Sequence, residues 1–216
     1  MTTKLSNAAA GVKLAALTAL LNGGSLKIYT GSMPTNVEDS ATGTLLLTEA
    51  LSATAFGAPS SVSGADATAA MNAVTQANGA TTADPGYYRL CKSDGTAVEQ
   101  GLVAAPRAVT VTIASPGVFT SVAHGFANGA PVKLATNGAL PTGLTAGTTY
   151  YVVSTATDTF GLSATVGGSA INTSGTQSGT HTVTRQDGDL NLGAPIYSGQ
   201  PVVISSWTKT EPVLGA

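Results

Sequence analysis

The chain has 216 residues, of which only 9% are charged and 5% are aromatic, and its formal net charge at pH 7 is −2. This length allows one large or two small domains, each with a hydrophobic core. The nine Lys and Arg residues are scattered and form no basic cluster, which argues against direct binding to nucleic acid. Gly, Ala, Thr and Ser dominate instead, a mixture that is typical of short strands and many turns. The resulting neutral surface suits either an ordinary β protein or a subunit of a larger assembly.

We expect the N-terminal region to be neither an export signal nor a membrane span. The apolar run Leu14–Leu21 is interrupted by Thr18 and is followed by Asn22-Gly23-Gly24, which is not a small-x-small cleavage site. No stretch reaches the roughly 18 apolar residues of a membrane helix. The single cysteine, Cys91, has no partner for a disulfide and is expected to be a buried small hydrophobe. We therefore expect synthesis in the cytoplasm.

The first predicted element is a helix within residues 7–22. Ser6 or Asn7 is a suitable N-cap, and Gly23-Gly24 ends the apolar pattern. A helix that is apolar around most of its circumference is usually covered on more than one side. It packs either against the sheet of its own chain or against a second subunit, and both interpretations stay open. The residues expected at an assembly interface are Val12, Leu14, Leu17 and Leu21.

Strands follow the helix, and a hairpin ends this half of the chain. Alternation and turn residues predict strands at Ser25–Thr30, Thr44–Leu51 and, in a stretch that is hard to interpret, Ala69–Gln76. Asp94-Gly95 predicts a two-residue type I′ hairpin between Tyr87–Lys92 and Ala97–Val103. The predicted register pairs Tyr88 with Gly101, Arg89 with Gln100, Leu90 with Glu99 and Cys91 with Val98.

Residues 107–184 differ in composition from both flanks, because Arg107, Lys133 and Asp158 are their only charged residues. Short alternating runs separated by turn signals predict six strands and a small barrel or sandwich. These runs are Val109–Ile113, Gly117–Val122, Pro131–Leu134, Tyr150–Ser154, Thr159–Leu162 and His181–Thr184.

Strand patterns resume at Leu190-Asn191-Leu192 and at Val202–Trp207, the expected closing strand. The sequence thus predicts a mainly β protein in which one domain interrupts another. Residues 1–106 and 185–216 form a split β-sandwich or jelly-roll-like domain with the N-terminal helix, and residues 107–184 form an inserted small all-β domain. Leu102-Val103 should then lie close to Asp189–Leu192.

Catalytic and metal-binding chemistry is not legible in the sequence. His124 and His181 have no Cys, Asp or Glu at ligand spacing, and a hydrogen-bonded turn histidine is the expected role of His124. Asp187 and Asp189 are too few carboxylates for more than a weak calcium hypothesis. We expect no enzyme activity, no catalytic residue, no metal and no cofactor. A different class of function is a glycan-binding module that uses Tyr150, Tyr151 and Phe160, although strand aromatics are more often core.

The inserted segment resembles a small β module that is widespread in tailed-phage proteins and is often named for its likeness to a domain of ubiquitin-activating enzymes. The resemblance rests on the segments AHGFANG (residues 123–129), LPTGLTAGTTYYVV (140–153), TFGLS (159–163) and GTQSGTH (175–181). It covers nearly all of residues 107–184 and implies no ubiquitin chemistry.

The flanks resemble a second group, small virion proteins of tailed phages that are similar to head-decoration proteins. The matching segments are LSNAAA (residues 5–10), SLKIYTG (25–31), LSATAFG (51–57), DGTAVEQG (94–101) and VVISSW (202–207). The resemblance implies a capsid decoration or cement protein on the virion surface, with the major capsid protein and neighbouring copies of itself as partners. It leaves open a tail or fibre component, and the inserted domain leaves open a contact with host surface glycan.

Overall fold

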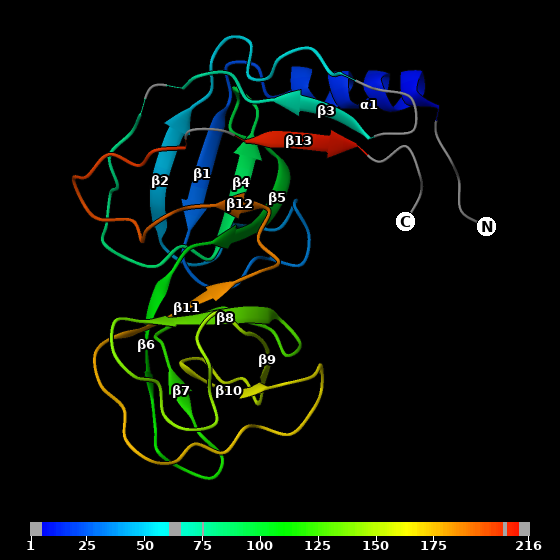
Figure 1. Ribbon diagram of the computed structural model, residues 1–216. Helices are drawn as coiled ribbons and strands as arrows, with labels where there is room; N and C mark the ends of the chain where they lie inside the picture. Colours follow the sequence, from blue (N-terminus) through cyan, green and yellow to red (C-terminus); the bar gives the residue numbers. More distant parts are fainter. Residues whose placement is uncertain (1–5, 61–65, 75, 205–206, 212–216) are drawn as a thin grey trace.

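The computed structural model describes residues 6–60, 66–74, 76–204 and 207–211. As predicted, the chain is mainly β with one N-terminal helix in this described part, and the strands form a five-stranded sheet, a two-stranded sheet and a closed barrel (Figure 1). The elements are α1 (Asn7–Ala19), β1 (Ser25–Tyr29), β2 (Leu45–Ala50), β3 (Ala67–Ala70), β4 (Tyr87–Cys91), β5 (Ala97–Ala104), β6 (Arg107–Val111), β7 (Phe119–Thr120), β8 (Pro131–Thr136), β9 (Thr149–Val153), β10 (Thr159–Ser163), β11 (His181–Arg185), β12 (Leu190–Asn191) and β13 (Thr208–Glu211).

The five-stranded sheet has the order β12-β5-β4-β1-β2 and takes strands from both sides of the barrel sequence. Leu190 of β12 pairs in parallel with Val103 of β5, and the backbone N–H of Asp189 donates to the carbonyl oxygen of Leu102 at 2.8 Å. The expected proximity of these two distant segments is therefore found. The chain leaves the sheet after β5, forms the barrel and returns beside the strand that it left (Figure 1).

The β4–β5 hairpin has the predicted register over most of its length but a different turn. Three of the four predicted pairs are present, whereas Cys91 pairs with Ala97 because the register shifts by one residue beside it. The backbone N–H of Gly95 donates to the carbonyl oxygen of Lys92 at 3.0 Å, and Gly95 has a φ of +88°. This is a type I turn followed by a left-handed glycine, not the predicted type I′ turn. The extra loop residue and the bulge compensate each other, which restores the predicted register.

A second layer lies beside the five-stranded sheet, in which the β3–β13 pair faces the sheet and α1 packs against β3 and β13 (Figure 1). Trp207, just before β13, packs edge-on against Tyr88 of the sheet at 4.7 Å and against Phe56 at 6.3 Å between ring centroids. Lys209 of β13 points into the same layer, where its ammonium group lies 4.0 Å from the Trp207 ring centroid and contacts the carboxylate of Glu99. The layer thus joins the last described strand to the centre of the sheet.

The predicted closing strand at Val202–Trp207 is wrong over its described part. Val202–Ile204 is irregular, and Trp207 precedes a strand that begins at Thr208. The strand forms after Trp207 instead, because its partner β3 pairs with Thr208–Glu211. The strand predicted at Ala69–Gln76 is wrong over most of its described part: β3 spans Ala67–Ala70, Met71 forms only an isolated bridge to Phe56, and Thr75 lies outside the described residues.

Helix α1 begins as predicted and ends slightly earlier than residue 22. The Ser6 hydroxyl accepts a hydrogen bond from the backbone N–H of Ala9 at 3.2 Å, which is the N-cap geometry. After Ala19 the backbone continues in tighter i to i+3 turns through Asn22, and Gly23 then adopts a φ of +65°. The tight turns satisfy carbonyl groups that a regular helix end leaves unpaired.

The six strands of residues 107–185 close into a barrel with the order β10-β7-β6-β11-β8-β9. All six predicted runs contribute a strand, with bounds shifted by a few residues. The barrel has its own core, in which Phe119 and Phe160 stack at 5.4 Å between ring centroids. The remaining buried core residues of the barrel are aliphatic except for Phe126 and Tyr150.

Three glycines bring the barrel and the five-stranded sheet into close backbone contact. A Cβ atom on Gly86 would collide with the carbonyl oxygen of Gly31, and a Cβ atom on Gly125 would lie 2.8 Å from that same oxygen. Gly125 also has a φ of +65°, a conformation that favours glycine. The backbone at Gly31 is therefore held between the sheet and the barrel.

A buried arginine at the start of β6 adds polar contacts to this junction. Arg107 donates to the carbonyl oxygens of His124 and Val122, and its Nε lies 3.5 Å from a carboxylate oxygen of Asp84. Its guanidinium also lies 5.5 Å from the ring centroid of Phe126. These contacts connect the segment before β4 to the β7–β8 connection of the barrel, so they orient the barrel relative to the sheet.

Candidate functional site

The residues predicted at an assembly interface do not form one surface. Leu14 and Leu21 are 1% and 0% exposed and belong to the core, so the prediction that they contact a partner is wrong. Leu17 is half-buried, whereas Val12 is 71% exposed. The helix thus follows the intramolecular interpretation on one side and leaves its other side open.

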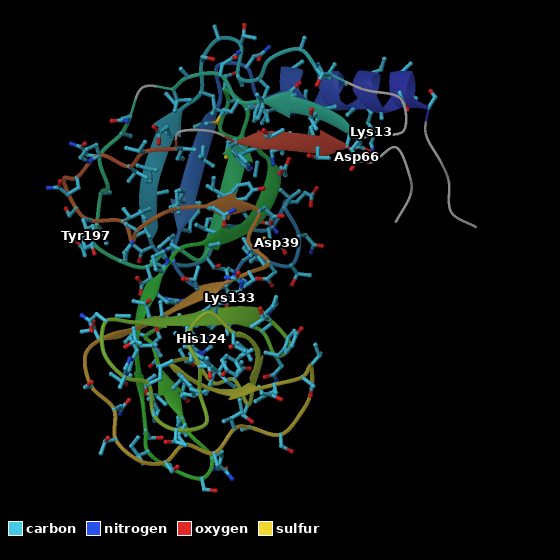
Figure 2. The ribbon with its side chains drawn as sticks, in the orientation of Figure 1. Lys13, Asp39, Asp66, His124, Lys133 and Tyr197 are labelled. Carbon is cyan, nitrogen blue, oxygen red and sulfur yellow. The ribbon has the colours of Figure 1, made fainter. Side chains whose placement is uncertain are left out.

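The open side of the helix is apolar, and we call it the exposed α1 face. Its apolar members are Ala8, Ala9, Val12, Ala15, Ala16, Ala19 and Leu20. The one charged side chain on this side, Lys13, forms an ion pair with Glu211 of β13. Figure 2 shows Lys13 at this end of the molecule, far from His124 and Lys133 in the barrel.

The three aromatic residues predicted as a glycan platform are not brought together on the surface. Phe160 and Tyr150 are buried in the barrel core, and the Tyr150 hydroxyl accepts a hydrogen bond from the backbone N–H of Thr145 at 2.8 Å. Tyr151 is half-buried and points to the other side of β9. The placement therefore contradicts a glycan contact by Tyr150 and Phe160.

His124 has the structural role expected from its sequence context. Its Nδ1 accepts a hydrogen bond from the backbone N–H of Phe126 at 3.0 Å, so the proton of the neutral ring resides on Nε2, which faces the carbonyl oxygen of Thr159 at 3.3 Å. Burial lowers the pKa of His124 below its ordinary value. The ring stays neutral at physiological pH and stabilises the turn beside the junction.

His181 lies at the edge of an open groove on the outside of the barrel, which we call the β6 groove. Its Nδ1 lies 2.8 Å from the Thr136 hydroxyl, and its Nε2 lies 3.1 Å from the side-chain oxygen of Gln177. The Gln177 amide in turn donates to the carbonyl oxygen of Val111 at 2.8 Å. Both ring nitrogens are thus engaged within the fold.

The β6 groove has a volume of about 810 Å³, within the range of roughly 300–1,000 Å³ that is usual for small-molecule sites. Two adjacent strands and the segment before β11 form its walls, and Asp84 adds a carboxylate from the junction. The lining residues are Asp84, Ala108, Val109, Thr110, Val111, Thr120, Ser121, Val122, Gln177, Ser178, Gly179, Thr180 and His181. The lining is thus mostly hydroxyl, amide and small aliphatic groups.

Other groups considered for chemistry are engaged in structural contacts. Asp187 pairs with Arg185 at 2.8 Å, and Asp189 accepts a hydrogen bond from the backbone N–H of Leu102 at 2.9 Å. In the described ranges, no group of three or more His, Cys, Asp or Glu side chains is placed to hold a metal ion. Cys91 is buried in β4, and burial raises the pKa of its thiol.

In the described part of the chain, no helix is long and apolar enough to span a membrane. No protein-family model, curated protein or solved structure matches the chain.

Sequence reasoning missed the β6 groove because its walls come from separate parts of the chain. Residues 108–111, 120–122 and 177–181 meet only after the barrel closes, and Asp84 lies outside the inserted segment. The one local signal is the alternation of Thr110 and Thr112 with Val109 and Val111, which marks an exposed strand face without indicating a shared groove.

Proposed function

We propose that the protein is a non-enzymatic structural protein of a tailed-phage virion that decorates the assembled head and stabilises it. The proposal rests on the resemblance of the flanks and of the inserted segment to phage virion proteins, together with the sparse charge of the chain. A partner that binds only the assembled shell stabilises that shell by mass action. The partners are the major capsid protein and neighbouring copies of this chain.

The observation that carries the proposal is the placement of two different surfaces at opposite ends of the molecule. Helix α1, which carries the exposed α1 face, lies beside the β3–β13 pair, and the barrel lies at the other end of the molecule (Figure 1). Apolar side chains with few charges are suited to a permanent interface, since little desolvation of charge opposes contact. In our proposal the α1 end attaches to the shell and the barrel projects outward.

The close packing at Gly31, Gly86 and Gly125 supports this arrangement. A barrel held by backbone contacts and by the Arg107–Asp84 pair keeps one orientation on every copy. A repeated lattice of identical subunits requires such uniformity, because neighbouring copies must present the same surfaces.

A pair of matched substitutions tests which end attaches. Val12→Asp on the exposed α1 face should reduce incorporation into particles about tenfold or more, because burying a carboxylate costs several kcal/mol and each 1.4 kcal/mol is tenfold in affinity. Val12 and Val166 of the barrel are similarly exposed, at 71% and 66%, so Val166→Asp is the control and should leave incorporation unchanged. Reduced incorporation of the Val166 variant alone would reverse the proposed orientation. Particles that carry only a few copies would favour the tail or fibre alternative.

A further inference from the structure

We propose that the β6 groove binds a neutral oligosaccharide. This inference goes beyond the structural role proposed above. It replaces the aromatic platform that the sequence suggested, because Tyr150 and Phe160 are buried in the barrel core, whereas the groove lies on the outside of the barrel and presents hydroxyl groups.

The groove exists because the barrel seam beside β6 is short. Strand β11 pairs with β6 only over the three positions from His181 to Val183. Before His181 the chain turns away and bridges instead to Ala139 and Thr142. The Gln177 side chain crosses the resulting gap and hydrogen-bonds the Val111 carbonyl in place of a backbone donor. The floor of the groove is therefore fixed, and a ligand need not order it.

Two neighbouring threonines supply hydrogen-bonding groups that the fold leaves unused. Thr110 of β6 and Thr120 of β7 are directly paired across the two strands, and both are exposed in the groove. Within the described part of the chain, neither hydroxyl has a hydrogen-bond partner. Directly opposed residues have Cβ atoms about 4.5–5.5 Å apart, so the two hydroxyls can bond adjacent hydroxyl groups of one sugar ring.

Apolar contacts complete the match to a sugar. Ala108 is exposed beside Thr110, and Val122 is 75% exposed beside Thr120. A sugar ring presents C–H groups between its hydroxyls, so a surface that alternates methyl groups and hydroxyls is complementary to it.

The charge of the groove selects neutral ligands over acidic ones. Asp84 is the only acidic residue in the lining, and no lysine or arginine is among the described residues that line it. The buried Arg107 pairs with Asp84 and donates to two backbone carbonyls, which holds the carboxylate in place. The paired carboxylate can accept hydrogen bonds from sugar hydroxyls. A sialylated or sulfated glycan or a phosphate finds no lysine or arginine in the lining to pair with its own charge, so its desolvation is not offset.

An open groove without an aromatic side chain binds one sugar weakly, so repeated copies are needed for stable attachment. Linked sites increase avidity by about 10²–10⁴ without any new contact. A decoration protein present in many copies would supply this multiplicity.

The test is a glycan array probed with the full-length chain carrying a biotin tag and assembled on streptavidin tetramers. We expect binding to neutral oligosaccharides and at least tenfold weaker binding to their sialylated or sulfated counterparts. The double variant Thr110→Val, Thr120→Val keeps shape and strand propensity and removes only the two hydroxyls. It should weaken binding about tenfold, the effect of two lost hydrogen bonds.

Two single variants on the opposite side of the closed barrel serve as controls. Strand β9 is three strands from β6 in either direction around the barrel, so Thr149→Val and Tyr151→Ala should leave binding unchanged. The inference is overturned if no neutral glycan binds, if acidic glycans bind best, or if the double variant binds as tightly as wild type, whether or not Tyr151→Ala loses binding. Because the array uses isolated protein, its outcome is independent of where the protein lies in a particle.

Discussion

Glu49 of β2 is a buried carboxyl group, and its removal should stabilise the protein at neutral pH. The side chain is 0% exposed and pairs across the sheet with Leu26. Among the described residues, neither carboxylate oxygen has a hydrogen-bond partner of normal geometry. Burial raises the pKa of Glu49, and the nearby backbone N–H of Ala77 offsets this only in part.

The sign of the pH dependence follows from the raised pKa. At a pH below the pKa of the unfolded chain, both states hold the proton and Glu49 adds no charge penalty. As the pH rises, the unfolded state releases the proton first, so the wild-type protein loses stability until the pH passes the folded pKa. Each unit between the two pKa values corresponds to about 1.4 kcal/mol of lost stability.

The variants Glu49→Gln and Glu49→Met separate charge from polarity. Glu49→Gln does not titrate, so its stability relative to wild type should increase from pH 4 to pH 8. Glu49→Met also removes the unpaired polar group, which is worth about 1–3 kcal/mol at all pH values. For a chain of this size, each kcal/mol raises Tm by about 2–4 °C.

Urea unfolding followed by fluorescence measures this effect in the right part of the molecule. Trp207 is the only tryptophan and lies in the same core cluster as Leu47 and Leu51, the buried neighbours of Glu49 along the chain. A Glu49→Gln variant that is less stable than wild type at pH 7, or a difference that does not change between pH 4 and pH 8, would refute the reasoning.

Two further predictions concern the junction and the thiol. Gly86→Ala should destabilise the protein by about 1–3 kcal/mol in thermal unfolding, because its new Cβ atom would collide with the Gly31 backbone. The control Gly193→Ala, whose Cβ atom would meet nothing within 4 Å, should change stability by less than about 1 kcal/mol. Equal effects of the two substitutions would contradict a tight junction. Cys91 is 2% exposed, and burial raises the pKa of its thiol. A thiol reagent such as DTNB should therefore label Cys91 only after denaturation. Rapid labelling of the native protein would contradict the burial of Cys91 in β4.

The helix and strands could be predicted from the sequence wherever a cap or a turn residue marks their ends. Ser6 caps α1, and each of the six runs of residues 107–184 overlaps a strand of the barrel. The β4–β5 register is correct at Leu90 although the turn type is wrong, because the bulge beside Cys91 offsets the longer loop. Local signals therefore identified strands more securely than they identified the turn between them.

The sequence could not predict features that depend on distant partners. All four residues of Thr208–Glu211 are polar, so the segment shows no apolar alternation, and only its pairing with β3 makes it a strand. The apolar pattern of α1 likewise does not indicate which side is buried: it predicts Leu14 and Val12 on one interface, whereas Leu14 is in the core and Val12 is exposed. The β6 groove also depends on barrel closure, which no local pattern encodes.

The central proposal, a head-decoration role with an outward barrel, is tested most directly by a reconstruction of the virion that contains this chain. The account predicts many copies on the capsid surface, with the exposed α1 face against the shell or a neighbouring copy and the barrel pointing away. A few copies confined to the tail, or a barrel that contacts the shell while the exposed α1 face points to solvent, would contradict it.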